Sequence, residues 1–134
     1  MKGKVNCVML IDDNIHDNFF HERALKKADV ADKIIIKEST ESALSFLKDT
    51  QDATYILPDI ILLDINMPIM NGWDFLEKYE ELEQSLRSKV IYLLSSSENP
   101  LDQERAKDSP LISGILPKPL TKEIVLREIG KIDF

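Results

Sequence analysis

The chain has 134 residues, which suits one compact domain and is short for two. Hydrophobic residues make up 43% and charged residues 31%, a balance that excludes a disordered or fibrous protein. The net charge of −7 opposes direct nucleic-acid binding, and no apolar run approaches the ~20 residues that span a membrane. We therefore expect a single cytoplasmic domain over residues 1–134 that acts through contacts with other proteins.

The first half of the chain alternates strand and helix patterns. Residues 5–11 form a mostly apolar run of strand length that ends at two aspartates. After Asn14, apolar residues recur near the helical period at Ile15, Phe19, Ala24, Leu25 and Ala28. The β-branched run 34–36 predicts a second strand. Ser39 or Thr40 can then cap a second helix, whose apolar face carries Ala43, Leu44 and Leu47. Residues 50–55 have the pattern of a loop.

The most apolar segment, residues 59–64, begins the second half and is typical of a central strand buried on both faces. Asn71-Gly72 marks a turn before a third helix, whose apolar stripe carries Trp73, Leu76, Tyr79 and Leu82. Residues 90–94 predict a fourth strand. Asn99-Pro100 then begins a short helix that ends by Pro110, because asparagine is a preferred cap and proline suits the first helical position.

The last strand and helix are short. Residues 114–116 predict a brief strand, and Pro117 places it at the edge of the sheet because proline donates no ladder hydrogen bond. Thr121 caps a final helix that turns four residues inward: Ile124, Val125, Ile129 and Ile132. Five strands alternating with five helices indicate an α/β fold, a doubly wound parallel sheet of order 2-1-3-4-5 with ligands at the carboxyl ends of the strands.

Polar residues follow four of the predicted strands. Asp12 and Asp13 end the first strand, Asp64 ends the third, Ser95 follows the fourth and Lys118 follows the fifth. In the expected strand order the first and third strands are neighbours, so the three carboxylates should meet. Such a cluster stays ionised at pH 7 only if a cation or a buried basic group compensates the charge, and its oxygen ligands suit Mg²⁺.

Each of these residues also has a plainer interpretation. The aspartates could be solvated strand ends or helix caps, and Ser95 could belong to a capping loop with Ser96 and Ser97. Lys118 could be a surface lysine in a Pro-Lys-Pro turn.

Residues outside this group are assigned structural roles. We expect Cys7 to be a buried thiol without a chemical role. His16 and His21 are expected on a polar helix face, and Trp73 and the Phe19-Phe20 pair in the core or between helices.

Four pieces in this order resemble the response-regulator receiver domains of two-component signalling. They are Asp12-Asp13 after an apolar strand, the run Asp64 to Pro68 with Gly72 following, Ser95 after the fourth strand, and Lys118-Pro119. The resemblance covers essentially the whole chain and implies a flavodoxin-like or CheY-like fold. The chain should therefore be a signalling domain and not an enzyme with steady turnover.

The resemblance also implies a role for each site residue. Asp64 would accept a phosphoryl group from a phosphohistidine. Asp13, Asp64 and the backbone carbonyl of Asn66 would hold Mg²⁺, and Asp12 would bind it through water. Ser95 and Lys118 would contact phosphoryl oxygens, which agrees with catalysis by alignment and charge neutralisation. A cis bond is expected at Lys118-Pro119.

The family's switch is expected to differ in this chain. The family commonly carries an aromatic residue three positions before the lysine, and Ile115 stands there. Tyr92 does not substitute for it by position. Serine at position 95 keeps the hydroxyl of the commoner threonine, and Asn66 and Ser97 occupy positions where the family tunes phosphate lifetime. The output surface would be formed by the last two helices and the strand between them.

The partners implied are a sensor histidine kinase or a histidine phosphotransfer protein and a downstream protein target. Direct nucleic-acid or membrane binding is not expected, and homodimer formation stays open. The alternatives are a phosphate-independent interaction module and an aspartyl-nucleophile phosphatase. The phosphatase group requires an acid two residues after the nucleophile, where this chain has Asn66. Because the last helix ends near Phe134, we expect a receiver without an output domain.

Overall fold

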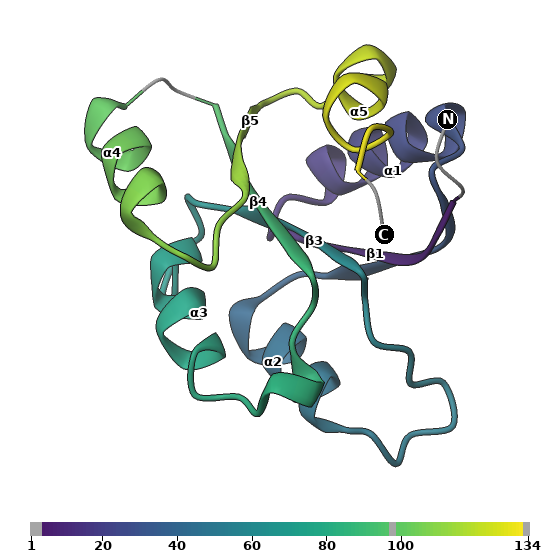
Figure 1. Ribbon diagram of the computed structural model, residues 1–134, viewed down its shortest axis with the longest axis vertical. Coiled ribbons are helices and arrows are strands. Elements are labelled where there is room, and N and C mark those ends of the chain that lie inside the picture. The colour runs from purple at the N-terminus through teal and green to yellow at the C-terminus, as the bar shows by residue number, and fades with distance from the viewer. Residues whose placement is uncertain (1–3, 97–98, 133–134) are drawn as a thin grey trace.

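The computed structural model describes residues 4–96 and 99–132, and Figure 1 shows its alternating strands and helices. The strands are β1 (Val5–Ile11), β2 (Ala31–Lys37), β3 (Ile60–Asp64), β4 (Val90–Ser95) and β5 (Gly114–Pro117). The helices are α1 (Ile15–Ala28), α2 (Thr40–Lys48), α3 (Gly72–Tyr79), α4 (Pro100–Asp108) and α5 (Lys122–Glu128). A 3-10 turn, Gln84–Leu86, precedes β4.

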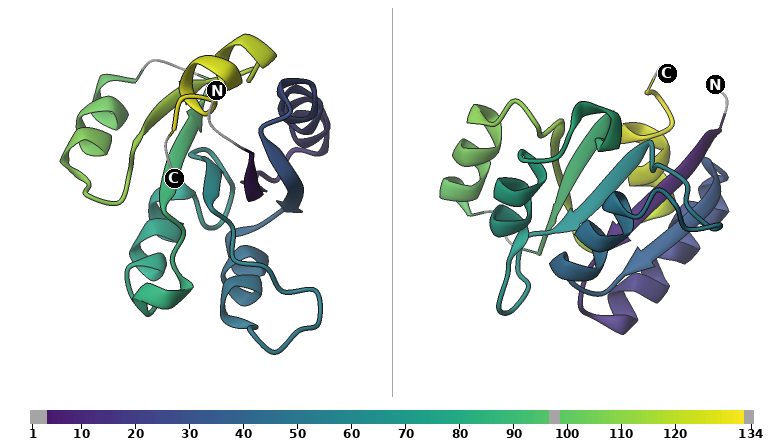
Figure 2. Two further views of the ribbon diagram at one scale, coloured as in Figure 1. Left: turned by 45° about the vertical axis from the view of Figure 1, so that its right-hand side comes forward. Right: turned by 90° about the horizontal axis from the view of Figure 1, so that it is seen from below.

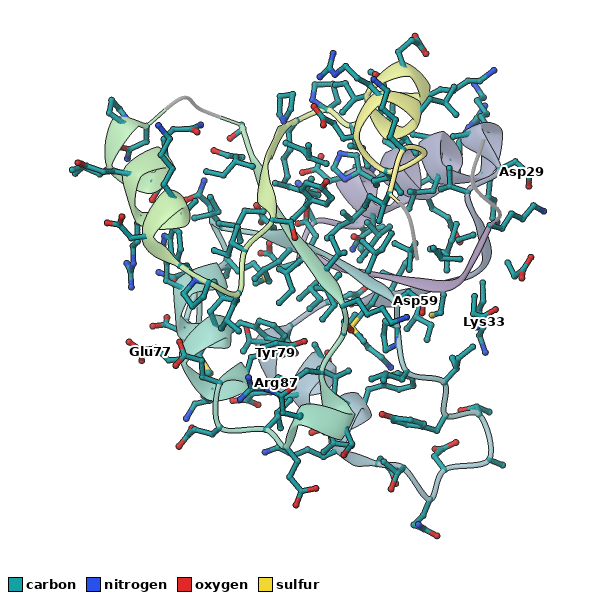
Figure 3. All side chains as sticks on the ribbon, in the orientation of Figure 1. Asp29, Lys33, Asp59, Glu77, Tyr79 and Arg87 are labelled. Carbon is teal, nitrogen blue, oxygen red and sulfur yellow. The ribbon has the colours of Figure 1, made fainter. Side chains whose placement is uncertain are left out.

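The five strands form one parallel sheet in the order β2-β1-β3-β4-β5, which confirms the predicted topology. Asp59, labelled in Figure 3, fixes the start of β3 against β1. Its Oδ2 accepts hydrogen bonds from the backbone N–H groups of Asn6 and Cys7 at 2.8 and 3.1 Å. This pairing aligns β1 with β3, so their carboxyl ends reach the same edge of the sheet.

Helices cover both faces of the sheet (Figure 2), and each face has its own apolar core. One core packs α1 and α5 against the sheet through Leu25 and Val125, which are both buried. The other packs α2, α3 and α4 through residues that include Leu47, Phe75 and Ala106. Because the central strands are covered on both sides, β3 is apolar from Ile60 to Leu63, as the sequence predicts.

The caps of the helices match the residue types expected from the sequence. Ser39, Asn99 and Thr121 cap α2, α4 and α5 with side-chain oxygens that accept backbone N–H groups. Asn71 caps α3 in a capping box with Asp74. Cys7 is buried as expected. Among the described residues, the structure contains no helix with the length and apolar character needed to cross a membrane.

Strand β2 is longer than the predicted run 34–36. It begins at Ala31, which pairs with Val5, and extends to Lys37. Its first part includes the exposed residues Asp32 and Lys33. These polar residues hide the strand from a hydrophobic pattern, since an edge strand needs apolar side chains only where the sheet is covered.

The predicted orientation of α1 is wrong in its first half. Ile15, Phe19 and Phe20 are exposed, whereas Asn18 and His21 are buried. The inward face of this half borders the polar end of the sheet, where Asn18 donates a hydrogen bond to the backbone carbonyl of Asp12 at 2.7 Å. The prediction for His16 holds, because it is exposed, and Trp73 is buried as expected.

Candidate functional site

Three carboxylates meet at the carboxyl end of the sheet. Asp12 and Asp13 directly follow β1, and Asp64 is the last residue of β3. Each offers a carboxylate oxygen, and these oxygens all lie within 4.8 Å of one another. Asp12 and Asp64 are 1% and 3% exposed, while Asp13 is open to solvent. The predicted cluster therefore forms, with one open and two buried members.

The loop after β1 holds Asp12 by several hydrogen bonds. The Asp12 backbone N–H donates to the carbonyl of Lys37 at 3.1 Å, which extends the pairing with β2. The carboxylate Oδ1 accepts the N–H of Asn14 at 3.0 Å. Asn14 in turn caps α1, since its side chain accepts the N–H groups of His16 and Asp17. The acidic loop and the first turn of α1 are thus one hydrogen-bonded unit.

The loop after β3 is held close to Asp64 by Gly72. The N–H of Gly72 donates to the carbonyl of Ile65 at 3.0 Å. A Cβ at position 72 would lie 2.9 Å from the carbonyl oxygen of Asp64, so the close approach requires glycine. The N–H of Asn66 donates to Asp64 Oδ1 at 3.3 Å, and the Thr40 hydroxyl donates to the carbonyl of Met70 at 3.2 Å.

Lys118 reaches the carboxylates from the end of β5. Its Nζ lies 2.8 Å from Asp12 Oδ2, 3.0 Å from Asp17 Oδ2 and 3.1 Å from Asp64 Oδ1. The backbone N–H of Lys118 donates to the backbone carbonyl of Ser95 at 2.9 Å, and the predicted cis bond is present at Lys118-Pro119. The surface-lysine interpretation is therefore wrong, because the ammonium is turned into the acidic cluster.

Burial and neighbouring charge set the ionisation of this site. Burial, followed by the charge of Asp12, raises the pKa of Asp64, while Lys118 opposes the rise. Burial alone would lower the pKa of Lys118, but its hydrogen bonds to Asp12 and Asp17 and the charges of Asp12 and Asp64 raise it above the ordinary value. Lys118 is therefore a permanent cation at neutral pH, and it stabilises the carboxylate form of its partners.

The donor set fits a hard divalent cation. The cluster presents three carboxylates close together. Among the described residues, the ammonium of Lys118 forms ion pairs with two of them, Asp12 and Asp64. Carboxylate oxygens on a partly open site suit Mg²⁺, which keeps several of its waters. A cation there would relieve the repulsion that raises the pKa of Asp64. Asp12, Asp13, Asp64 and the nearby backbone of Asn66 are the groups that would hold it.

A model of the response regulator receiver domain family matches residues 8–129, most of the chain. The chain belongs to the response regulator receiver family. Its fold agrees: a two-component response regulator from Cytophaga hutchinsonii is 32% identical, covers 96% of each chain and superposes with a TM-score of 0.85. A receiver protein from Dyadobacter fermentans is 31% identical, with coverage of 92% and 97% and a TM-score of 0.76.

Curated relatives include regulators of different lengths. The probable methanogenesis regulatory protein FilR2 of Methanothrix harundinacea is 26% identical over 125 residues, which is 93% of this chain and 79% of FilR2. The nitrate/nitrite response regulator NarL of Escherichia coli K12 is 37% identical over 76 residues, 56% of this chain and 35% of NarL. The receiver chain thus matches about a third of NarL, and the likeness concerns the receiver part.

The residues expected to take part in switching lie as follows in this receiver domain. Ser95 is buried at the end of β4, next to Leu94, which pairs with Asp64 across the sheet. Ile115 is partly buried in the core shared with α4 and so offers an aliphatic contact at the usual aromatic position. Tyr92 donates its hydroxyl to the carbonyl of Glu128, toward α5. Ser97 lies outside the described residues.

Asp17 is the site residue that sequence reasoning missed. It lies in the first turn of α1 and contacts Lys118, yet no strand end precedes it. The signal available was its position four residues after Asp13, which directs a first-turn side chain toward the same end of the sheet. That signal was weak because the reach of a helical residue depends on how the helix is rotated about its axis.

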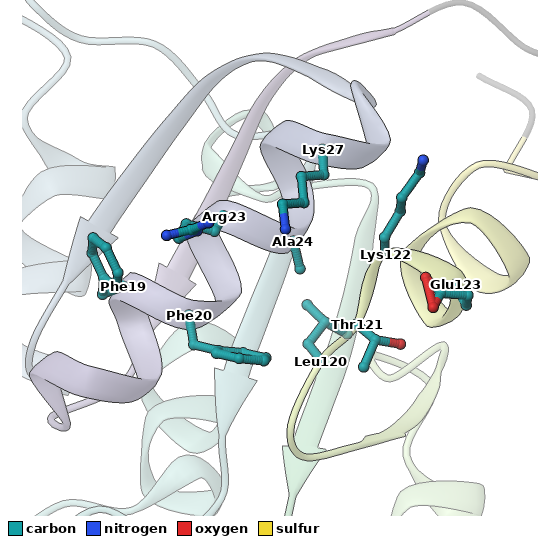
Figure 4. Close-up of a pocket in the computed structure, with 9 residues that line it drawn as sticks. All are labelled: Phe19, Phe20, Arg23, Ala24, Lys27, Leu120, Thr121, Lys122 and Glu123. Atoms are coloured by element: carbon teal, nitrogen blue, oxygen red, sulfur yellow. The ribbon is translucent and has the colours of Figure 1, made fainter.

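A hollow of about 410 Å³ lies beside the site, between α1 and α5. Figure 4 shows Phe19 and Phe20 on its α1 side and Leu120 and Thr121 across from them. None of the three clustered carboxylates lines this hollow. It is therefore a feature of the receiver surface separate from the acidic pocket.

Proposed function

We propose that this receiver domain is a Mg²⁺-dependent phosphoacceptor whose Asp64 takes a phosphoryl group from a phosphohistidine of a sensor kinase or a phosphotransfer protein. The observation that carries the proposal is the convergence of Lys118 on Asp12 and Asp64 within a cluster of three carboxylates. A lysine drawn into a pocket with excess negative charge leaves a site suited to a cation and a phosphate. Family membership agrees with this chemistry.

In the proposed transfer, a carboxylate oxygen of Asp64 attacks phosphorus and forms the new P–O bond. The P–N bond to the donor imidazole breaks, its electron pair stays on nitrogen, and that nitrogen takes a proton from solvent. Catalysis then rests on alignment of attacking and leaving atoms and on neutralisation of the equatorial oxygens. The Asn66 N–H, which donates to Asp64 Oδ1, would fix the direction of the carboxylate.

Lys118 and Ser95 are the protein groups proposed to contact the phosphoryl oxygens. Lys118 already lies 3.1 Å from Asp64 Oδ1, and Ser95 follows the residue that pairs with Asp64. Bound Mg²⁺ would supply further positive charge at the same oxygens. Catalysis would be limited to the domain's own phosphorylation and dephosphorylation, so the protein is proposed to be a cytoplasmic signalling domain and not a turnover enzyme.

Phosphorylation is proposed to switch a surface formed by α4, β5 and α5. Ser95 ends β4 immediately before the segment that leads into α4, so a shift of its hydroxyl toward the phosphate would be passed to that helix. The downstream target would be a protein that binds the phosphorylated and unphosphorylated states with different affinities. The target would bind either the phosphorylated monomer or a phosphorylated homodimer of the receiver.

The decisive experiment is phosphate incorporation from a small phosphodonor, followed by intact mass. The wild-type protein is expected to gain one phosphate in the presence of Mg²⁺, and Asp64→Asn none. Asp52→Asn, in an exposed loop at the other end of the sheet, is the matched control and should label like the wild type. Normal labelling of Asp64→Asn would refute the assignment, and steady release of phosphate from a phosphomonoester would favour a phosphatase instead.

A further inference from the structure

Lys118 forms ion pairs with three carboxylates, and one of these, Asp17, lies outside the acidic cluster. The ammonium donates hydrogen bonds to Asp12 and Asp17 and forms an ion pair with Asp64 at 3.1 Å, so its three N–H groups are shared among three carboxylates. Asp12 and Asp64 are almost fully buried, whereas the Asp17 side chain is 39% exposed at the rim. Asp17 therefore holds Lys118 from the solvent side, opposite the buried end of the site.

The position of Asp17 is fixed by the same unit that holds the acidic loop. Its backbone N–H donates to the side chain of Asn14 at 3.1 Å, within the cap of α1. As an acid in the first turn, it is also stabilised by the N-terminal end of the helix dipole. The backbone of Asp17 is thus held in place independently of Lys118, so its carboxylate extends toward the lysine from a fixed point of the helix.

Asp17 does not belong to the group that could hold a metal. The oxygens that lie within 4.8 Å of one another are those of Asp12, Asp13 and Asp64. Its described contact in the site is with the ammonium of Lys118. A role for Asp17 must therefore be exerted through the lysine.

We infer that Asp17 is a positioning residue that holds the Lys118 ammonium for phosphoryl transfer to Asp64, an inference that rests on the proposed function. With Asp17 in place, the charge of Lys118 is shared among three carboxylates and the ammonium lies 3.1 Å from Asp64 Oδ1. Phosphoryl transfer needs only the N–H that faces Asp64 to change partner, while Asp12 and Asp17 keep hold of the other two. Without Asp17, Lys118 would be free to turn and pair more tightly with Asp64, which would occupy the attacking oxygen.

The test compares Asp17→Ala with Asp17→Asn in the full chain. Both variants lose the charge, but the asparagine oxygen still accepts a hydrogen bond from Lys118. The labelling rate at saturating Mg²⁺ and phosphodonor is expected to fall about fivefold or more in Asp17→Ala, the loss of one charge-assisted hydrogen bond, and markedly less in Asp17→Asn. Glu22→Ala is the matched control, since Glu22 is an acid on the same helix paired with Lys26 at 3.5 Å.

Two further measurements separate positioning from a general loss of structure. Mg²⁺ affinity, from calorimetry with the metal alone, and the thermal midpoint of Asp17→Ala should stay close to those of Glu22→Ala. The proton NMR signal of the Lys118 ammonium in unphosphorylated protein should be protected in the wild type and lost in Asp17→Ala. This last readout does not depend on labelling.

Three outcomes would overturn the inference. They are an Asp17→Ala rate equal to that of Glu22→Ala, an Asp17→Asn rate as slow as that of Asp17→Ala, or an unchanged Lys118 signal. The failure of the proposed function would look different: wild-type protein that takes up no phosphate would remove the reaction itself, and the inference with it.

Discussion

Ile69 is the most unusual single residue near the site. It lies in the loop between β3 and α3 with φ of 67°, in the left-handed region, and its side chain is 99% exposed. A β-branched residue is strained there, because its Cβ approaches backbone oxygen, and no burial compensates. The acidic site is thus bordered by a loop that stores strain.

Replacing Ile69 with asparagine should remove much of this strain. Asparagine tolerates the left-handed region, so Ile69→Asn is expected to raise the free energy of unfolding by about 1 kcal/mol. Urea denaturation measures this. Ile15→Asn is the control, because Ile15 is also exposed but begins a right-handed helix. Equal effects of the two variants would show that strain at position 69 is not the cause.

The residues of the acidic cluster were predictable for a geometric reason. Asp12 and Lys118 each follow a strand and Asp64 ends one, and the carboxyl ends of parallel strands share one edge of the sheet whatever the details of packing. Asp17 and His21 were not predictable in this way. Both lie on α1, where contacts depend on the rotation of the helix, and burial with the charge of Lys118 lowers the pKa of His21 and favours its neutral form.

At the scale of elements, α4 is attached to the rest of the domain by few contacts. Ala106 is its one buried residue among those described. Trp73 in α3 adds two contacts: its indole N–H donates to Asp102 Oδ1 at 3.2 Å, and the Arg105 guanidinium lies 4.4 Å from the centre of its ring. A helix with one buried residue and a few polar contacts to a neighbouring helix can shift at low cost, which suits the proposed switch surface.

Removing the Trp73 partner should loosen α4 selectively. Asp102→Ala is expected to speed amide hydrogen exchange in α4 about fivefold, the equivalent of one hydrogen bond, with little change in the central strands. Asp102→Asn keeps an acceptor and should recover part of the protection. Glu104→Ala, on the exposed side of α4, is the control. The same acceleration in Glu104→Ala would show that the Trp73 contact is not what holds the helix.

The elements themselves were predicted well where covered on both sides and poorly where they are not. The run 60–63 is apolar throughout because β3 is buried on both faces. The start of β2 was missed because exposed edge residues carry no apolar signal. In α1, Phe19 and Phe20 line the hollow next to α5, so their spacing reflects a surface groove and not the core.

At the scale of the whole molecule, the site opposes the stability of the fold. The net charge is −7, and three of the negative charges lie close together at the carboxyl ends of β1 and β3. The raised pKa of Asp64 also lowers stability. The buried carboxylate is harder to ionise than in the unfolded chain, so its ionisation reduces the free energy of unfolding as the pH rises above the pKa of the unfolded state. A bound cation would offset this cost.

Stability should therefore depend on Mg²⁺, and Asp13 is the residue with which to test it. Wild-type protein is expected to become more stable to urea in millimolar Mg²⁺, because a ligand that binds only the folded state stabilises it. Asp13→Asn should lose that response. Without Mg²⁺, its free energy of unfolding should be higher than that of the wild type by roughly 0.5 to 1 kcal/mol. Asp52→Asn should respond to Mg²⁺ like the wild type, and an unchanged response in Asp13→Asn would exclude Asp13 as a ligand.

The position of Trp73 has a practical consequence. It is the single tryptophan of the sequence, it follows the glycine that packs on the backbone of Asp64, and its indole contacts both Asp102 and Arg105 of α4. The tryptophan fluorescence of the protein therefore reports on one place, the contact between the end of β3 and α4. The chain carries its own optical probe, so metal binding, phosphorylation and helix movement could be followed in time on unlabelled protein from one fluorescence trace.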